Sequence, residues 1–446
     1  MHRALSAFLA TTALDRADAH RRRVLAAFQE KSRGDRLDDA ALQSAQDAAL
    51  AALLNHAQRA VPFYREHLAR AGEIRPEAAR SMLASLPIIQ RADLQRAPEH
   101  FHAESAGEVL MDATGGSSGT PLRFRVDRAT QRARESSLYW SDALAGWRYG
   151  ERIAMLWGSD KDVKSAAQHA RTQLRWWIDN RRWFNAFNMG EDRMAEFHAA
   201  MTRFAPHLIV AYAGSMEVYA RFLEKCGWTP SYPARGIVCS AEVLTRTARE
   251  TIERVFRKPV FNRYGNREFG AIAAECSAHE GLHVNAHDMI VEIDSADPER
   301  VPGPLIVTYL HNRAMPFIRY NTGDLALRMP PRPCACGRTT ARLTSIVGRE
   351  SDTVRTRGGR LIHGEYFTHL LYGARRVREF QFVQESLDLY RLLLVADGRE
   401  APEVEAGWRA AIHEEVGADA RVEIAYVDAI PVLASGKRKF TVSKVG

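Results

Sequence analysis

The chain has 446 residues, of which 46% are hydrophobic and 26% are charged. This balance excludes a disordered chain, and the length allows a sizeable core without metal or disulfide staples. Lys and Arg number 62 against 54 Asp and Glu, a net charge of +8. The basic residues are mostly arginine and lie among acidic ones, so we expect no nucleic-acid partner. Five cysteines exclude a disulfide scaffold and predict a reducing, cytoplasmic location.

No run of 18 or more apolar residues is present, so we expect no transmembrane helix and no membrane partner. Residues 1–14 combine a basic His-Arg pair with a short apolar stretch, as a weak signal peptide would. They lack a small-residue cleavage motif and continue into a charged segment, which favours a first helix. Apolar residues at helical spacing extend this prediction over residues 36–72.

Short apolar runs alternate with helical patterns in the middle of the chain. The runs cover residues 153–157, 208–212, 236–239 and 260–264. This rhythm predicts βαβ units and a mainly parallel sheet. From about Met289 the strands become shorter and are interrupted by Gly and Pro, which predicts a small antiparallel subdomain.

We therefore predict an α/β protein, α+β overall, with two domains. The large N-terminal domain covers residues 1–347: a helical segment at 1–105, a parallel α/β core at 106–288 and a small β subdomain at 289–347. A small α+β domain follows at 348–446, because the chain there is locally self-contained.

Residues 114–121 read Thr-Gly-Gly-Ser-Ser-Gly-Thr-Pro. Glycine lets backbone N–H groups approach an anion closely, and the hydroxyls add donors, so the loop can hold phosphates. It is not a Walker A loop, because no Lys follows the last Gly. An exposed Gly/Ser linker explains the composition equally well.

Four further segments carry charged residues at strand ends, in turns or in a tail: 263–270, 319–324, 347–352 and 434–439. Glu268 follows a predicted strand end, where ligands bind in open α/β sheets. Asp324 lies on a turn from which a carboxylate can accept hydrogen bonds from ribose hydroxyls. Lys437 is a mobile charge within reach of a phosphate. Singly, an ordinary turn, linker or solvated tail explains each segment.

Together, their order and spacing resemble the adenylate-forming superfamily of acyl-CoA synthetases, nonribosomal-peptide adenylation domains and luciferases. The chain is most similar to the phenylacetate-CoA ligase branch and its capsular-polysaccharide-type relatives. Four segments carry this closer resemblance: Val61-Pro-Phe-Tyr64, Leu86-Pro-Ile-Ile89, Cys239-Ser-Ala-Glu242 and Ser435-Gly-Lys437.

The resemblance implies that ATP activates a carboxylic acid to an acyl-adenylate with release of pyrophosphate, after which the CoA thiol displaces AMP. Lys437, on a mobile C-terminal domain, and Glu268 are implied as catalytic residues, and Glu268 and Thr120 as Mg²⁺ ligands. The other implied ATP and AMP contacts are Thr114, Ser117, Ser118, Gly119, Thr120, Ser240, Ala241, Glu242, Arg263, Tyr264, Gly265, Asp324 and Arg349. Among them Tyr264 and Gly265 flank adenine, and Asp324 binds ribose.

Two positions depart from the family pattern. Ser351 stands at the hinge, two residues after Arg349, where the superfamily usually has Asp or Lys. Hinge residues need only absorb backbone rotation, so the domain can still rotate. Asn266-Arg267 replaces the Leu-Ser or Met-Thr that the branch often has beside the magnesium carboxylate.

Cys276, His283, Cys334 and Cys336 match the donor set of a closed structural zinc site. The tight C-x-C spacing is not the common C-x₂-C, and His279 competes with His283 as a ligand. The alternative is a set of free, partly buried thiols.

The acid pocket is predicted between the phosphate loop and the adenine motif. Its candidate residues are Tyr139, Trp157, Tyr212, Gly214 and Ser215. Aromatic candidates favour an aryl or hydrophobic acid, although core packing also explains each of them.

Three functions remain open from the sequence. The leading one is an AMP-forming ligase that makes an acyl-CoA from a small carboxylic acid. The second keeps adenylation but transfers the acyl group to an amine or a separate carrier protein. The third is a nucleotide-binding module without catalysis. Both a monomer and a homodimer are compatible with the sequence.

Overall fold

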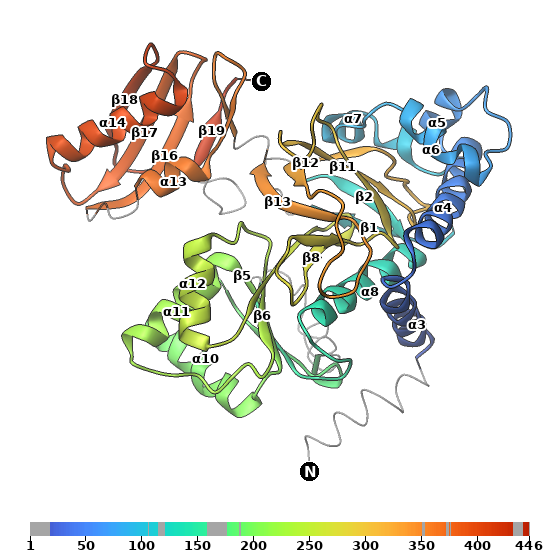
Figure 1. The fold of residues 1–446 in the computed structure, drawn as a ribbon, viewed down its shortest axis with the longest axis horizontal. Helices are drawn as coiled ribbons and strands as arrows, with labels where there is room; N and C mark the ends of the chain where they lie inside the picture. The colour runs from blue at the N-terminus through green and yellow to red at the C-terminus, as the bar shows by residue number, and fades with distance from the viewer. Residues whose placement is uncertain are drawn as a thin grey trace.

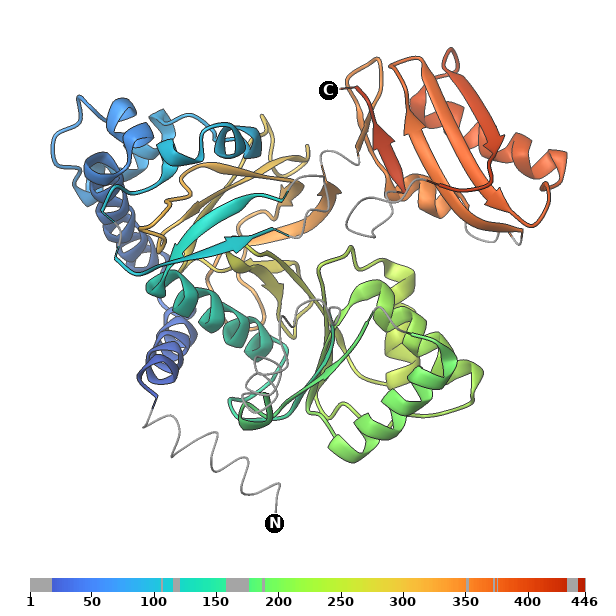
Figure 2. The same cartoon turned by 180° about the vertical axis from the view of Figure 1, so that it is seen from behind.

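The computed structural model describes residues 18–105, 107–114, 121–157, 176–186, 189–349, 353–371, 374, 376–430 and 440–445. A large N-terminal part and a smaller C-terminal α+β domain lie beside one another (Figures 1 and 2). Within the described ranges, none of the helices is both long and apolar enough to cross a membrane.

The chain begins, within these residues, with helices. They are α3 (Ala19–Gly34), α4 (Asp39–Ala60), α5 (Pro62–His67), α6 (Pro76–Ser85), α7 (Arg91–Arg96) and the 3₁₀ helix η2 (Pro98–Phe101). Asp38 caps α4 by accepting a hydrogen bond from the backbone N–H of Ala41 at 2.7 Å. Leu50, Leu53 and Leu54 recur at helical spacing and are fully buried. This confirms the predicted helix over much of 36–72.

One 11-stranded sheet forms the centre, in the order β10-β11-β12-β13-β9-β8-β7-β6-β5-β3-β4. Strands β3 to β7 are parallel, as predicted, and the rest are antiparallel. The parallel strands are β3 (Ile153–Leu156), β4 (Arg181–Phe184), β5 (Leu208–Tyr212), β6 (Gly236–Ser240) and β7 (Val260–Asn266). The antiparallel strands are β8 (Gly270–Glu275), β9 (Leu282–Val284), β10 (Met289–Ile293), β11 (Gly303–Tyr309), β12 (Tyr320–Arg328) and β13 (Arg342–Arg349).

The change of direction occurs at β8, earlier than the Met289 transition in the sequence pattern. Asn266 accepts a hydrogen bond from the N–H of Phe269 at 3.0 Å, and Gly270 adopts a φ of +79°. This short turn returns the chain beside β7, and a hairpin of this kind produces antiparallel neighbours. The parallel strands and the antiparallel strands of the large N-terminal part therefore belong to one sheet.

The parallel strands β3, β5 and β6 are buried on both faces. Helices α10 (Glu191–Phe204), α11 (Ala213–Lys225) and α12 (Arg246–Phe256) lie together on one side (Figure 1). Ile209 and Ala211 pack on that side, whereas Leu208 and Val210 pack with Trp147 in a second cluster. Burial on both faces explains why β5 is a continuous apolar run. Helix α8 (Arg128–Leu144) contacts β8, and β1 (Val109–Ala113) pairs with β2 (Arg123–Asp127) before it.

The C-terminal domain has a core of its own. Its four-stranded sheet has the order β18-β17-β16-β19, and Phe367 stacks on Phe382 with ring centroids 3.5 Å apart. The elements are β14 (Thr353–Arg355), β15 (Leu361–His363), α13 (Glu365–Leu370), β16 (Val377–Gln384), β17 (Leu389–Ala396), α14 (Pro402–Val416), β18 (Arg421–Tyr426) and β19 (Thr441–Ser443). This confirms the predicted α+β character.

Candidate functional site

The carboxyl ends of the parallel strands bring several predicted residues to one edge of the sheet. Tyr212 is paired in register with Ser240, and Ser240 with Arg263. Trp157 directly follows β3, and Tyr264 follows Arg263 along β7. In open α/β sheets this edge is where ligands bind.

Tyr264, Asp324 and Arg349 meet, although they belong to three different strands. The Tyr264 hydroxyl donates a hydrogen bond to Asp324 Oδ2 at 2.6 Å, and Arg349 Nε lies 3.5 Å from Asp324 Oδ1. Burial, and then the Asp324 carboxylate, raise the pKa of Tyr264 well above its usual value, so its hydroxyl remains a donor. The residues predicted for adenine and ribose therefore form one cluster.

Glu268 lies in the turn between β7 and β8, with 6% of its surface exposed. Burial raises the pKa of Glu268, and the charges of Arg91, Arg349 and Arg134 oppose that rise. A buried carboxylate faced by cations, beside the Tyr264–Asp324 cluster, fits a position for Mg²⁺ and phosphate. Its predicted partner Thr120 lies outside the described residues.

The neck of the predicted phosphate loop is closed by Thr114 and Leu122. Thr114 N–H donates to Leu122 O, and Leu122 N–H donates to Thr114 Oγ1, both at 2.9 Å. Arg91 Nη2 also donates to Thr114 Oγ1 at 2.9 Å. Sequence reasoning missed Arg91, although it follows the Leu86–Ile89 segment that carries the family resemblance.

Several predictions fall where the structure describes nothing. These are Ser117, Ser118, Gly119, Thr120, the hinge residue Ser351 and Lys437. Their predicted roles stay predictions.

Ser240 ends β6, and the chain bends at Ala241 and Glu242 directly after it. Ala241 adopts a φ of +65°, and the Ser240 hydroxyl donates to Arg263 O at 2.8 Å. Glu242 Oε2 accepts a hydrogen bond from Gly214 N–H at 2.8 Å, which joins this bend to the start of α11. The bend is thus fixed from two sides.

The Arg263 side chain is directed to helix α8. Its Nη1 atom lies 3.0 Å from Asp142 Oδ1, and both side chains are buried. Burial lowers the pKa of Arg263, and the Asp142 carboxylate opposes this shift. Its guanidinium therefore has a structural partner on α8. Gly265 follows at a β-bulge between β7 and β8.

The acid-pocket candidates divide into two groups. Trp157 and Tyr212 stack with ring centroids 4.2 Å apart, and both are half-buried at the sheet edge. Ser215 lies near them in the first turn of α11. Tyr139 instead contacts Phe28, Trp147 and Tyr149, and the Arg181 guanidinium lies 5.4 Å from its ring centroid.

Cys276, His283, Cys334 and Cys336 converge as predicted. One candidate ligand atom from each lies within 4.8 Å of the others. His283 Nε2 lies 3.3 Å from Cys336 Sγ, while its Nδ1 is held at 2.9 Å by the Thr340 hydroxyl. Burial, then the charges of Arg338 and Arg342, lower the pKa of His283 to about 4, so the free imidazole is neutral near pH 7. The donor set fits tetrahedral Zn²⁺.

His279, the competing ligand, lies apart from this cluster. Its ring packs on Phe261 with centroids 4.9 Å apart, and its Nδ1 lies 3.5 Å from Glu275 Oε2. The tertiary structure thus chooses His283.

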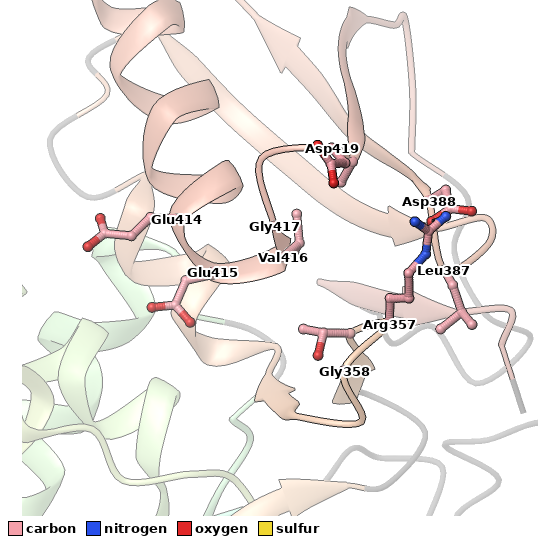
Figure 3. A pocket seen from close by; sticks show the side chains of 11 residues that line it. Arg357, Gly358, Leu387, Asp388, Glu414, Glu415, Val416, Gly417 and Asp419 are labelled. Carbon is pink, nitrogen blue, oxygen red and sulfur yellow. Dashed lines mark ion pairs between the residues drawn. The ribbon is translucent and has the colours of Figure 1, made fainter.

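A separate hollow of about 320 Å³ lies in the C-terminal domain (Figure 3). Glu414 and Glu415 lie on the side opposite Arg357 and Asp388. Arg357 pairs with Asp388 at 2.5 Å, and Arg360 pairs with Glu415 at 2.6 Å. None of the predicted site residues lines this hollow.

Comparisons with known proteins show what this chain is similar to in sequence and in fold. The model of the CapK C-terminal domain family matches residues 354–444. Protein CapK of Staphylococcus aureus is 20% identical over 400 residues, 88% of this chain and 87% of that protein. Phenylacetate-coenzyme A ligase of Thermus thermophilus is 26% identical over 335 residues, 71% of this chain and 72% of that protein.

A solved structure of 2-hydroxyisobutyryl-CoA ligase with 2-HIB-AMP, in the postadenylation state, aligns over 93% of this chain and 92% of that one. Its TM-score is 0.70 at 18% sequence identity, which confirms the predicted fold. O-succinylbenzoate coenzyme A synthetase of Bacillus subtilis, in complex with ATP and magnesium, covers 74% of this chain and 68% of its own, with a TM-score of 0.51 at 15% identity. In sequence the chain is thus similar to CapK and to phenylacetate-CoA ligases, and in fold it is similar to a CoA ligase of the adenylate-forming type.

Proposed function

We propose that this protein is an AMP-forming acid–thiol ligase. ATP and a carboxylic acid would form an acyl-adenylate and pyrophosphate, and the CoA thiol would then displace AMP. The observation that carries this proposal is the meeting of Tyr264, Asp324 and Arg349, with the buried Glu268 in the turn that follows β7 and under the influence of the Arg349 charge. The named CoA ligases among the relatives support the same reaction.

The proposed roles follow from the charges of the reactants. A carboxylate must attack the negatively charged α-phosphate, so catalysis consists mainly of positioning and charge stabilisation. Asp324 is suited to accept hydrogen bonds from ribose hydroxyls, and Tyr264 holds that carboxylate in place. Mg²⁺ bound by Glu268 and Thr120 would neutralise phosphate charge. Lys437 would supply a further cation during adenylation.

We propose an aryl or hydrophobic acid as the substrate. The support is the Trp157–Tyr212 stack, whose half-buried rings lie at the same sheet edge as Ser240. Flat aromatic surface favours apolar and aromatic groups. Gly214 and Ser215 start α11 beside this pair, and the Gly214 N–H is already bonded to Glu242.

We also propose a structural zinc ion at Cys276, His283, Cys334 and Cys336. Three sulfur donors and one imidazole nitrogen give the closed four-ligand set of structural sites. The Thr340 bond to Nδ1 directs His283 Nε2 to the three thiols.

All five cysteines are free of disulfides, which supports a reducing, cytoplasmic location.

A pyrophosphate-release screen tests the proposed reaction without assuming the acceptor. The protein is incubated with ATP, Mg²⁺ and single carboxylic acids that range from aryl to short aliphatic. We expect release with an aryl or hydrophobic acid and a new acyl-CoA mass when CoA is added. The same reaction with amines in place of CoA distinguishes the two ligases, because an amide-forming ligase would give a product with the mass of an amide. No pyrophosphate with any acid, together with retained ATP binding, would favour a silent nucleotide-binding module.

A further inference from the structure

We propose that Arg91, on helix α7 of the N-terminal helical segment, belongs to the nucleotide site and contacts the β- and γ-phosphates of ATP. This inference rests on the proposed function. It adds a cation on the N-terminal helical segment to a site for which a further cation, Lys437, is predicted on the C-terminal domain.

The segment before Arg91 is held against strand β12. Ile89 N–H donates to Arg319 O, and Asn321 N–H donates to Ile89 O, both at 2.9 Å. Asn321 Nδ2 also donates to Gln90 Oε1 at 3.0 Å. The start of α7 is therefore fixed a few residues from Asp324, which belongs to the same strand.

The Arg91 guanidinium reaches the phosphate loop. Its Nη2 atom donates to Thr114 Oγ1 at 2.9 Å, and Thr114 and Leu122 close the neck of that loop. A cation bound to the neck stands where the phosphate-binding backbone begins. Thr114 keeps it there before any nucleotide arrives.

The same guanidinium acts on Glu268, the proposed Mg²⁺ ligand. Its charge opposes the rise that burial causes in the pKa of that carboxylate, and it also opposes the rise that burial causes in the pKa of the Tyr320 hydroxyl. Arg91 thus stands among the phosphate loop, Glu268 and β12. A planar guanidinium binds phosphate oxygens with two parallel donors, so it suits a polyphosphate in this position.

This placement predicts a ground-state contact. Helix α7 is fixed to the sheet, so Arg91 would hold ATP before the reaction. Its loss should raise the Michaelis constant for ATP more than it lowers kcat. AMP lacks the β- and γ-phosphates, so its binding should change little.

The experiment titrates ATP and AMP, each with Mg²⁺, into the wild type, Arg91→Met, Arg91→Lys and Arg96→Met by calorimetry. Arg96 is the control, because it lies on the same helix with 77% of its side chain exposed. We expect Arg91→Met to raise the dissociation constant of ATP roughly ten- to a hundred-fold, the scale of one charged hydrogen bond. The dissociation constant of AMP should rise less than about three-fold. Arg91→Lys should recover part of the loss, and Arg96→Met should match the wild type.

Melting temperatures separate this role from a structural one. Equal weakening of ATP and AMP by Arg91→Met, with a lowered melting temperature, would show that Arg91 only holds α7 and the loop, and would overturn the inference. Unchanged ATP binding by Arg91→Met would also overturn it. A wild type that binds no ATP would instead refute the proposed function.

Discussion

Asp35 and Arg338 are 303 residues apart in the chain and form an ion pair, with 2.9 Å between Arg338 Nε and Asp35 Oδ2. Asp35 ends helix α3, and only 1% of it is exposed. It also accepts hydrogen bonds from Trp140 on α8 at 2.8 Å and from His287 at 3.0 Å. Because Arg338 follows Cys336 by two residues, this carboxylate ties the cysteine loop to two helices.

Purified protein should contain about one zinc per chain, and Cys334→Ser should lose it. Thermal stability should fall before the chemistry changes, because the four ligands join loops and are not among the residues proposed to bind the nucleotide or the acid. Hydrogen exchange should rise in residues 19–34, since Arg338 would no longer be held beside Asp35. Elemental analysis, thermal denaturation and exchange mass spectrometry measure these three effects. Cys226→Ser, which alters an exposed thiol, is the control; metal-free protein with unchanged melting of Cys334→Ser would disprove the zinc site.

Asp35→Asn should destabilise the fold by roughly 3 kcal/mol, since removal of one partner leaves Arg338 largely buried without its counter-charge. Urea denaturation near pH 7 measures this loss. Glu30→Gln alters an exposed carboxylate on the same helix and should be nearly silent. Equal stability of the two variants would contradict a structural role for the pair.

The stabilisation that the ionised Asp288 carboxylate gives to the fold should be lost as the pH falls below about 4. Lys31 Nζ lies 2.7 Å from Asp288 Oδ2, and His311 Nε2 lies 2.7 Å from Oδ1. Burial raises the pKa of Asp288, but Lys31 and His311 outweigh it, and the pKa is lowered overall. The stabilisation is then complete above the unfolded-state pKa of about 4 and is lost as the pH falls toward the folded-state value.

Comparison of the wild type with Asp288→Asn tests this dependence. The difference in unfolding free energy should be constant from about pH 5 to 7 and should shrink below pH 4. A difference that does not change with pH would show that the Asp288 charge contributes nothing to stability.

Asp324→Ala should raise the Michaelis constant for ATP, because hydrogen bonds to ribose worth ~1.5–3 kcal/mol each would be lost. Tyr264→Phe should have a smaller effect, since it removes only the hydroxyl that positions the carboxylate. A pyrophosphate assay over a range of ATP concentrations measures both. An unchanged constant for Asp324→Ala would refute the ribose role.

Lys437→Ala should slow adenylation by ~10²–10³-fold, the scale for one preorganised donor in a transition state. Lys444→Ala is the control, since Lys444 pairs with Glu385 at 2.5 Å on the surface and should be nearly silent. Transfer from preformed acyl-adenylate to the acceptor should survive in Lys437→Ala. Equal loss in both half-reactions would argue against domain rotation.

Local patterns in the sequence were enough to predict the alternating strands and helices, the α+β C-terminal region and the cysteine–histidine set. These features depend on residue periodicity, turn residues and donor type, all of which are written along the chain. The strand-end motifs also predicted that candidate residues meet at one edge of the sheet, because parallel strands place their carboxyl ends together, and Tyr212, Ser240 and Arg263 do lie side by side there.

The tertiary structure alone decided which side chains face one another. The β7–β8 hairpin joined the parallel and antiparallel halves into one sheet, and thereby brought Tyr264 to Asp324. The tertiary structure also directed Arg263 to α8, selected His283 over His279 at the cysteines, and brought Arg91 to Thr114. Contacts of this kind depend on strand register and on the docking of distant segments, and no local periodicity encodes either.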